Sequence, residues 1–143
     1  MIKEPFHQYD PETHEAICIL TYGDFKFVGT AICHPEDYDM ESEKTGQTIA
    51  YLRAAIKYYQ HLKNNEIYPK LAALKQYYYS INQSKQFDSK SYEVRMLQRQ
   101  IQNYKDDLVV VRCSLAQLQK NLREFIKIKE DMYNKVRTNR KEK

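Results

Sequence analysis

The sequence has no tryptophan, only three glycines and four prolines, and no long apolar run. Without an apolar run of about 20 residues there is no candidate for a membrane-spanning helix, and the start of the chain does not resemble a signal peptide. Few glycines and prolines leave few positions for turns, which favours a small number of long elements. We therefore expect a cytosolic protein without a membrane partner, built as one domain over residues 1–143.

Chemistry-bearing clusters are also scarce. The three cysteines, Cys18, Cys33 and Cys113, are widely spaced and form no CxxC pair, which indicates neither a disulfide framework nor a zinc site. The four histidines lack metal-ligand spacing, and there is no glycine-rich phosphate loop. We therefore expect no metal, no cofactor and no enzymatic activity.

What the chain has in abundance is tyrosine and charge. Thirteen tyrosines suit wet interfaces and stacking on ligands, although most could equally lie at the edges of a helical core. The first third of the chain is acidic and the remainder is basic, ending in a basic tail over residues 136–143. Such a tail can contact nucleic acid, but a solvated helix end explains it as well, so nucleic acid is not the expected partner.

A seven-residue apolar repeat dominates the last third of the chain. It runs through Val94, Leu97, Ile101, Tyr104, Leu108, Val111, Leu115, Leu118, Leu122 and Phe125. Such a repeat keeps one apolar seam on one side of a long helix. We expect this helix over residues 89–135, with Asp88 or Ser89 as N-cap. An earlier helix is too short to cover the whole seam, which predicts a homodimer or higher homo-oligomer.

The first half of the chain shows a hairpin signal. After a polar stretch over residues 1–14, expected to be an extended arm, residues 15–33 fold about Gly23-Asp24, a two-residue turn that matches strand twist. The pairing sets Leu20 opposite Phe27 and Cys18 opposite Gly29, on an apolar face that must lie on a helix or a second hairpin.

A helix over residues 42–82 follows, kinked or broken at Pro69, with Ala50 and Ala54 allowing close approach. The predicted fold is therefore α+β: a short N-terminal antiparallel β-hairpin, then long α-helices, the last with the heptad repeat, assembling as a helical homo-oligomer.

The arginines suggest a binding site. Arg112 flanks the seam where its apolar face is widest, and Arg53 stands among alanines and leucine on the first helix. A guanidinium in such a place needs either a buried carboxylate or an anionic ligand. Both alternatives stay open for Arg112, because it could form an intermolecular salt bridge or bind a phosphate.

Arg99 and Arg123 fall on the outer side of the repeat, where they are either solvated or part of a phosphate site. His34 has the alternative of being a plain turn residue before Pro35. The candidate ligand-binding set is Arg53, Arg112, Arg123, Arg99, Tyr78 and His34.

The segment Gly29-Thr-Ala-Ile-Cys33-His34-Pro35-Glu-Asp37, with Gly46 and the run Ile49-Ala50-Tyr-Leu-Arg53-Ala54-Ala-Ile-Lys57, resembles small phage proteins, above all the first type of Thoeris anti-defence protein. The resemblance implies a short β element, two long C-terminal helices and pockets between subunits. It also implies a non-enzymatic sponge, in the cytoplasm of the infected bacterial host, that sequesters cyclic ADP-ribose-type signals and in some members cyclic oligonucleotides.

Two classes of function therefore compete, beside a third possibility, a purely structural coiled-coil assembly factor. One is a sponge for cyclic nucleotide signals, for which arginines would hold the phosphates and tyrosines the base. The alternative is a coiled-coil interaction protein or inhibitor that binds a host protein or nucleic acid through its helices. Only the sponge predicts a melting-temperature shift with a small nucleotide.

Overall fold

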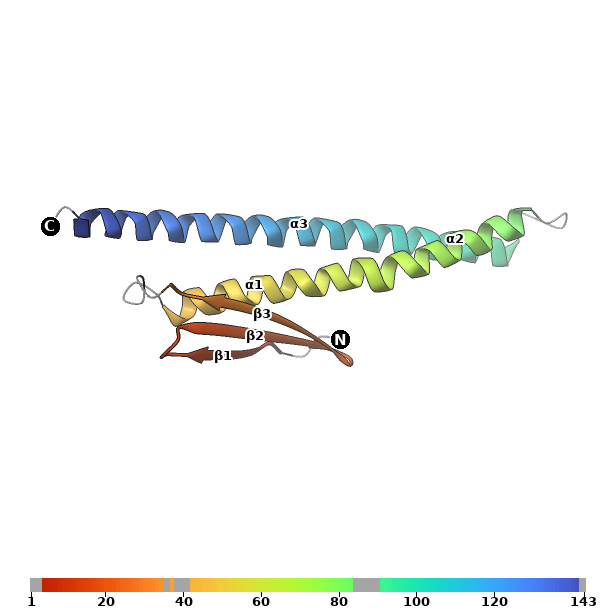
Figure 1. Ribbon diagram of the computed structural model, residues 1–143. Helices are drawn as coiled ribbons and strands as arrows, with labels where there is room; N and C mark the ends of the chain where they lie inside the picture. The colour runs from red at the N-terminus through yellow and green to blue at the C-terminus, as the bar shows by residue number, and fades with distance from the viewer. Residues whose placement is uncertain (1–3, 35–36, 38–41, 84–90, 142–143) are drawn as a thin grey trace. The chain divides into compact units, whose positions relative to one another are not determined.

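The computed structural model describes residues 4–34, 37, 42–83 and 91–141 of the chain. Three strands come first: β1 (Phe6–Asp10), β2 (Glu15–Tyr22) and β3 (Phe25–Ile32). The helices follow as α1 (Glu43–His61), the π-helical segment η2 (Leu62–Ile67), α2 (Tyr68–Asn82) and α3 (Tyr92–Lys141). Figure 1 labels the strands and α1, α2 and α3. The α+β class predicted from the sequence is confirmed.

Contacts between Cα atoms divide the chain into two units. The sheet unit comprises Met1–Tyr58 and Ala116–Lys143, and the helical unit comprises Tyr59–Leu115. Each unit has a hydrophobic cluster of its own. The single domain expected from the sequence stays a prediction.

The hairpin of β2 and β3 has the predicted register. Leu20 lies opposite Phe27 and Cys18 opposite Gly29, around a turn in which Gly23 takes the left-handed φ of 58°. Ala16, Cys18, Leu20 and Ala31 are all buried on the same face of the sheet, as the pairing requires. Burial raises the pKa of the Cys18 thiol, so this cysteine is an inert core residue.

The predicted extended arm over residues 1–14 contains a third strand, β1, which was not anticipated from the sequence. β1 pairs antiparallel with β2, from Phe6 opposite Ile19 to Asp10 opposite Glu15. The Asp10 carboxylate closes the connection by accepting the backbone N–H of Glu12 at 2.8 Å, which lowers the pKa of that carboxyl. An Asp-Pro pair initiates turns in this way. The sequence therefore marks the turn between β1 and β2, whereas the polar residues of β1 do not reveal the strand itself.

The buried face of the sheet packs against α1 so closely that there is no room for a side chain at position 29. A Cβ on Gly29 would overlap the carbonyl oxygen of Ala50 and come within 2.5 Å of the backbone nitrogen of Ala54. Both alanines are fully buried, as their predicted role in close approach requires. The cluster is completed by partly buried side chains of α3, namely Leu118, Leu122, Phe125 and Ile126.

We expect Gly29→Ala to destabilise the sheet unit by about 3 kcal/mol, because the obstructing atoms are helix backbone and have little freedom to move. Gly23→Asn is the matched control. Nothing lies within 4 Å of a Cβ at Gly23, and asparagine tolerates its left-handed φ, so this change should cost under about 1 kcal/mol. Urea denaturation of both variants measures the difference, and equal losses would contradict the close contact.

In the helical unit, the path through Pro69 is broken into two kinds of helix, as predicted. Pro69 stands in the first turn of α2, where its missing N–H is tolerated, and the π-helical segment precedes it. The backbone N–H of Tyr68 bonds to the carbonyl of Lys63, five residues back. This wider turn is how the helix accommodates the proline ring without an abrupt end.

The heptad seam on α3 is partly covered within a single chain. Leu108 and Val111 are each 7% exposed and form a cluster with Ile67 and Leu71, whereas Ile101 and Tyr104 are only partly buried. The homo-oligomer stays a prediction. Ser91 caps α3 by accepting the N–H of Val94 at 3.2 Å. The expected caps Asp88 and Ser89 lie outside the described residues.

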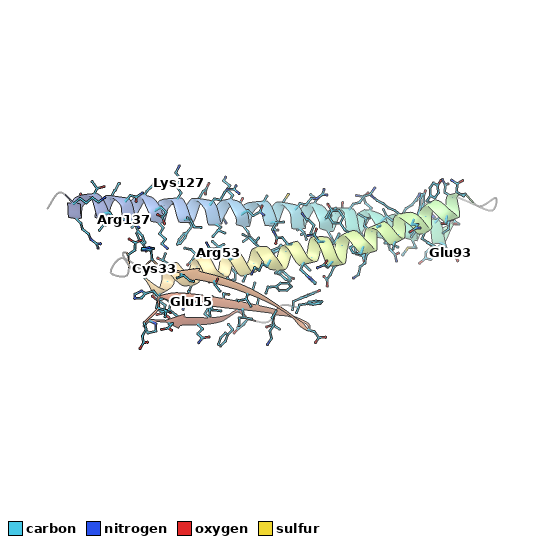
Figure 2. All side chains as sticks on the ribbon, in the orientation of Figure 1. Glu15, Cys33, Arg53, Glu93, Lys127 and Arg137 are labelled. Atoms are coloured by element: carbon cyan, nitrogen blue, oxygen red, sulfur yellow. The ribbon has the colours of Figure 1, made fainter. Side chains whose placement is uncertain are left out.

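One ion pair ties the segment after β3 to α3 within the sheet unit. Among the described residues, Asp37 is the one buried side chain that carries a charge, and Arg137 holds it through two hydrogen bonds. Arg137, labelled in Figure 2, also donates to Asn134 at 2.9 Å. The basic end of α3 is thus partly a structural anchor and helical as far as Lys141.

Arg137→Ala should lower the free energy of unfolding by about 3 kcal/mol, because it strands a buried carboxylate. Replacing Asp37 as well, in Asp37→Ala/Arg137→Ala, removes the stranded charge and should recover part of that loss. The two variants are compared by thermal unfolding at neutral pH. A double variant less stable than Arg137→Ala would show that the carboxylate is not the costly group.

Candidate ligand-binding groove

The hollows of the helical unit lie along the α2–α3 pair. Two of them, of about 420 and 460 Å³, adjoin at Lys75 and Lys105, which line both, and we treat them as the two halves of one groove. We call it the tyrosine–cation groove, after the residues that define it: Tyr68, Lys75, Tyr78, Tyr79, Lys105 and Arg112. Each volume falls in the range of small-molecule sites.

The tyrosine–cation groove is electropositive. Lys75, Lys105 and Arg112 line it, and none of its described lining residues is an aspartate or glutamate. The nearest acid along the chain, Asp106, lines neither half; it accepts a hydrogen bond from Gln102 at 2.9 Å and keeps its charge. Leu71 and Leu108 form the apolar floor of one half. Cations over an apolar floor attract an anion more strongly than they would in open water.

Arg112 differs from its sequence-based description. The side chain is exposed, and its guanidinium donates to the Tyr68 hydroxyl, a neutral acceptor. The guanidinium carbon lies 5.5 Å from the centre of the Tyr68 ring, but contact at the hydroxyl places it toward the ring edge, so the hydrogen bond is the main interaction. No carboxylate of the described residues pairs with Arg112. The charge is positioned by a tyrosine yet not neutralised.

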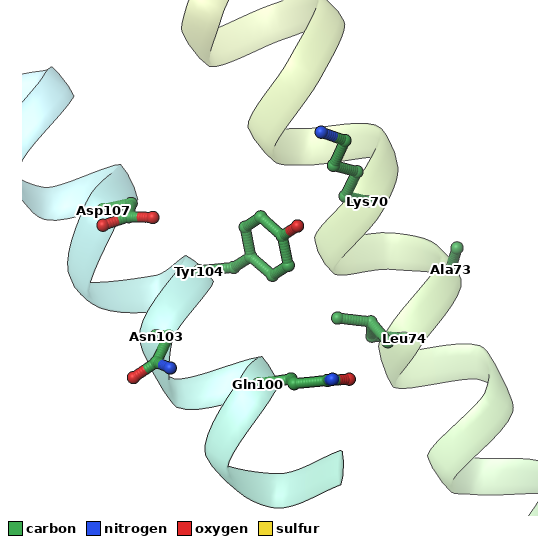
Figure 3. Close-up of a pocket in the computed structure, with 7 residues that line it drawn as sticks. All are labelled: Lys70, Ala73, Leu74, Gln100, Asn103, Tyr104 and Asp107. Carbon is green, nitrogen blue, oxygen red and sulfur yellow. The ribbon is translucent and has the colours of Figure 1, made fainter. Parts of the chain in front are cut away.

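On the other side of the helix pair lies a second hollow, the Lys70–Asp107 pocket, of about 490 Å³. Figure 3 shows Tyr104 reaching from α3 toward α2, between Lys70 and Leu74. Although this pocket is slightly larger than either half of the groove, its one lysine is matched by Asp107, and Glu66 lines the adjoining hollow. Its mixed charge makes it a poorer site for an anion than the tyrosine–cation groove.

Arg53 belongs to the sheet unit and has a structural partner. Its Nη1 donates to the carbonyl oxygen of Thr30 at 2.7 Å, and Lys57 donates to that of Val28 at 2.7 Å. Both carbonyls belong to β3, the edge strand of the sheet beside which Figure 2 labels Arg53. The two cations of α1 thus cap carbonyls at a sheet edge that would otherwise be open to further strands.

The other predicted site residues are dispersed. Tyr78 lines the groove and accepts a hydrogen bond from Gln98 at 3.0 Å. Arg99 is exposed on α3 and lines none of the hollows described above, and Arg123 is exposed in the sheet unit. His34 is exposed just after β3, while Pro35 lies outside the described residues. Of the six predicted residues, the structure therefore places Arg112 and Tyr78 in one groove.

Sequence reasoning missed Tyr68, Lys75, Tyr79 and Lys105. A signal existed, because Tyr68, Lys75 and Tyr79 recur at spacings of seven and four, which puts them on one face of a helix. Lys105 and Arg112 are likewise seven residues apart on α3. The spacing within each helix does not show that the face on α2 meets the face on α3, because that depends on how the two helices pack.

Comparison of the chain with family models, with curated proteins and with solved structures finds no match in any of the three. Within the described part of the chain, no three His, Cys, Asp or Glu side chains gather as a metal site would require. None of the described helices combines the length and apolarity needed to span a membrane.

The two arginines should therefore behave differently when removed. Arg53→Ala should cost about 1 kcal/mol of stability, since it breaks a charge-assisted hydrogen bond to Thr30. Arg112→Ala should change stability by less than about 0.5 kcal/mol, because its charge is exposed and has no carboxylate partner. Arg99→Ala is the control for removal of an exposed arginine. Urea denaturation without ligand is the measurement, and a large loss in Arg112→Ala would reveal a structural role.

Proposed function

We propose that this protein is a sponge that binds and sequesters cyclic nucleotide signals, of the cyclic ADP-ribose type or cyclic oligonucleotides, without cleaving them. The observation that carries the proposal is the tyrosine–cation groove. Its three cations are suited to phosphates, and its three tyrosines offer rings to a base. The resemblance to the Thoeris anti-defence proteins supplies the ligand class and the setting, an infected bacterial cytoplasm.

Binding without cleavage is supported by the chemistry of the groove. Its described lining residues include no His, Cys, Asp, Glu or Ser, which are the side chains that most often serve as general base or nucleophile in hydrolysis. Lysine and arginine there act as charge partners. A groove of this composition can hold a phosphodiester and shield it, which is what sequestration requires.

Cyclic ADP-ribose isomers and cyclic oligonucleotides are to be screened by thermal shift and calorimetry. A ligand at 100 times its Kd stabilises the fold by about 2.7 kcal/mol, so a true ligand should visibly raise the Tm. Lys105→Ala/Arg112→Ala should weaken binding at least tenfold, and higher salt should weaken it further. Chromatography of the released ligand should recover it unchanged.

Lys70→Ala is the matched control, because Lys70 lies in the Lys70–Asp107 pocket on the other side of the same helix pair. It should leave the affinity intact. A Lys70→Ala loss as large as that of Lys105→Ala/Arg112→Ala would place the ligand elsewhere. Absence of any thermal shift, with a host protein or nucleic acid bound instead, would favour the interaction-protein alternative.

A further inference from the structure

The tyrosine–cation groove is chemically different at its two ends. One half contains Arg112, Tyr68 and the apolar floor of Leu71 and Leu108. The other half replaces these with a set of rings and amides: Tyr78, Tyr79, Asn82, Gln98 and Gln102. Lys75 and Lys105 line both halves and so stand at the junction. A simple polyanion would use the cations but would gain little from the amide end.

The amide half has the parts that recognise a nucleobase. Tyr79 is 64% exposed, so the ring has a face available for stacking. A carboxamide carries a donor and an acceptor side by side, which is the pattern that matches the edge of adenine. Gln98 uses one N–H on the Tyr78 hydroxyl at 3.0 Å, and its carbonyl oxygen remains as an acceptor.

Tyr78 is well placed to hold this end in shape. It is half-buried, and its hydrogen bond links α2 to α3 across 20 residues of sequence separation. A ring fixed in this way loses little conformational freedom when a ligand arrives, which lowers the cost of binding. Tyr79 then provides the stacking surface, and Asn82 and Gln102 provide amides at the rim.

We propose that the groove is a two-part site for a purine nucleotide, with the phosphates at the Lys75–Lys105 junction and the base on Tyr79 among the amides. This inference rests on the proposed function and narrows its ligand class. Phosphate contacts supply affinity for any anion, whereas the amide half discriminates a nucleotide from a bare phosphate chain. The ligand therefore lies along the helix pair with its base toward the C-terminal end of α2.

The test measures binding of ADP, pyrophosphate and adenosine to the full chain by calorimetry. ADP and pyrophosphate carry similar charge, so a difference in affinity reports the base. ADP should bind about tenfold tighter than pyrophosphate or more, since stacking of one base on a ring contributes at least that factor. Adenosine should bind more weakly than ADP. Lys75→Ala should weaken both ADP and pyrophosphate.

Tyr79→Leu is the discriminating variant, and Tyr77→Leu is its control. Tyr77 has a similar exposure, 61%, in the same helix but does not line the groove. Tyr79→Leu should weaken ADP about tenfold and leave pyrophosphate unchanged, while Tyr77→Leu should change neither. Equal affinity for ADP and pyrophosphate, or equal effects of the two tyrosine variants, would overturn the two-part site.

The same titrations separate this inference from the proposed function. If ADP shows the expected pattern but no cyclic nucleotide binds, the two-part site holds and the sponge is wrong. If a cyclic nucleotide binds with an affinity that Tyr79→Leu does not change, the sponge holds and the two-part site is wrong. If neither ADP nor any cyclic nucleotide binds, both are wrong.

Discussion

The sheet depends on the absence of one side chain. Gly29 lets the backbone of β3 approach the backbone of α1 at Ala50 and Ala54 more closely than any Cβ would permit. The hairpin register then determines which residues are buried. Cys18 lies opposite Gly29, and the alternate residues Ala16 and Leu20 of the same strand face the same side of the sheet. A slip of one residue would turn that face to solvent, so turn, register and helix contact specify one another.

The helical unit is organised around a different constraint, the proline in the middle of a helical stretch. Leu62 and Ile67 both contribute to its cluster although they are five residues apart, a spacing that suits a π-helical turn rather than an α-helical one. Ile67 and Leu71 then resume the spacing of four. The wide turn therefore keeps the apolar side chains on the core face while the missing N–H of Pro69 is accommodated.

These two constraints explain which features could be read from the sequence. The hairpin, its register, the helix break and the long α3 follow from local rules of turn, period and proline, and all are confirmed. β1 was missed because a short polar strand at a sheet edge has no apolar alternation to reveal it. Seam positions such as Leu108 and Val111 are buried, as predicted, but period alone does not say which surface will meet the positions that are only partly buried.

The candidate site divides in the same way. Arg112 and Tyr78 were found because an unusual charge beside an apolar seam and an aromatic on a helical face are visible locally. Arg53 looked equivalent to Arg112, yet its partner is a backbone carbonyl 23 residues away. No sequence pattern distinguishes a guanidinium that meets a strand edge from one that meets a tyrosine.

The cations of the two units differ in their partners. Some are held by groups of the fold itself, and others have no described carboxylate beside them and can contact a ligand. In the sheet unit, Arg53 and Lys57 are engaged by strand carbonyls and Arg137 by a buried carboxylate. In the tyrosine–cation groove, Arg112 has only a phenol, and neither Lys75 nor Lys105 forms an ion pair among the described residues. Like charges gathered without acids repel each other, and a bound anion relieves that repulsion. The groove therefore gathers three cations that form no ion pair with a described carboxylate, which is the condition that a phosphate-bearing ligand needs.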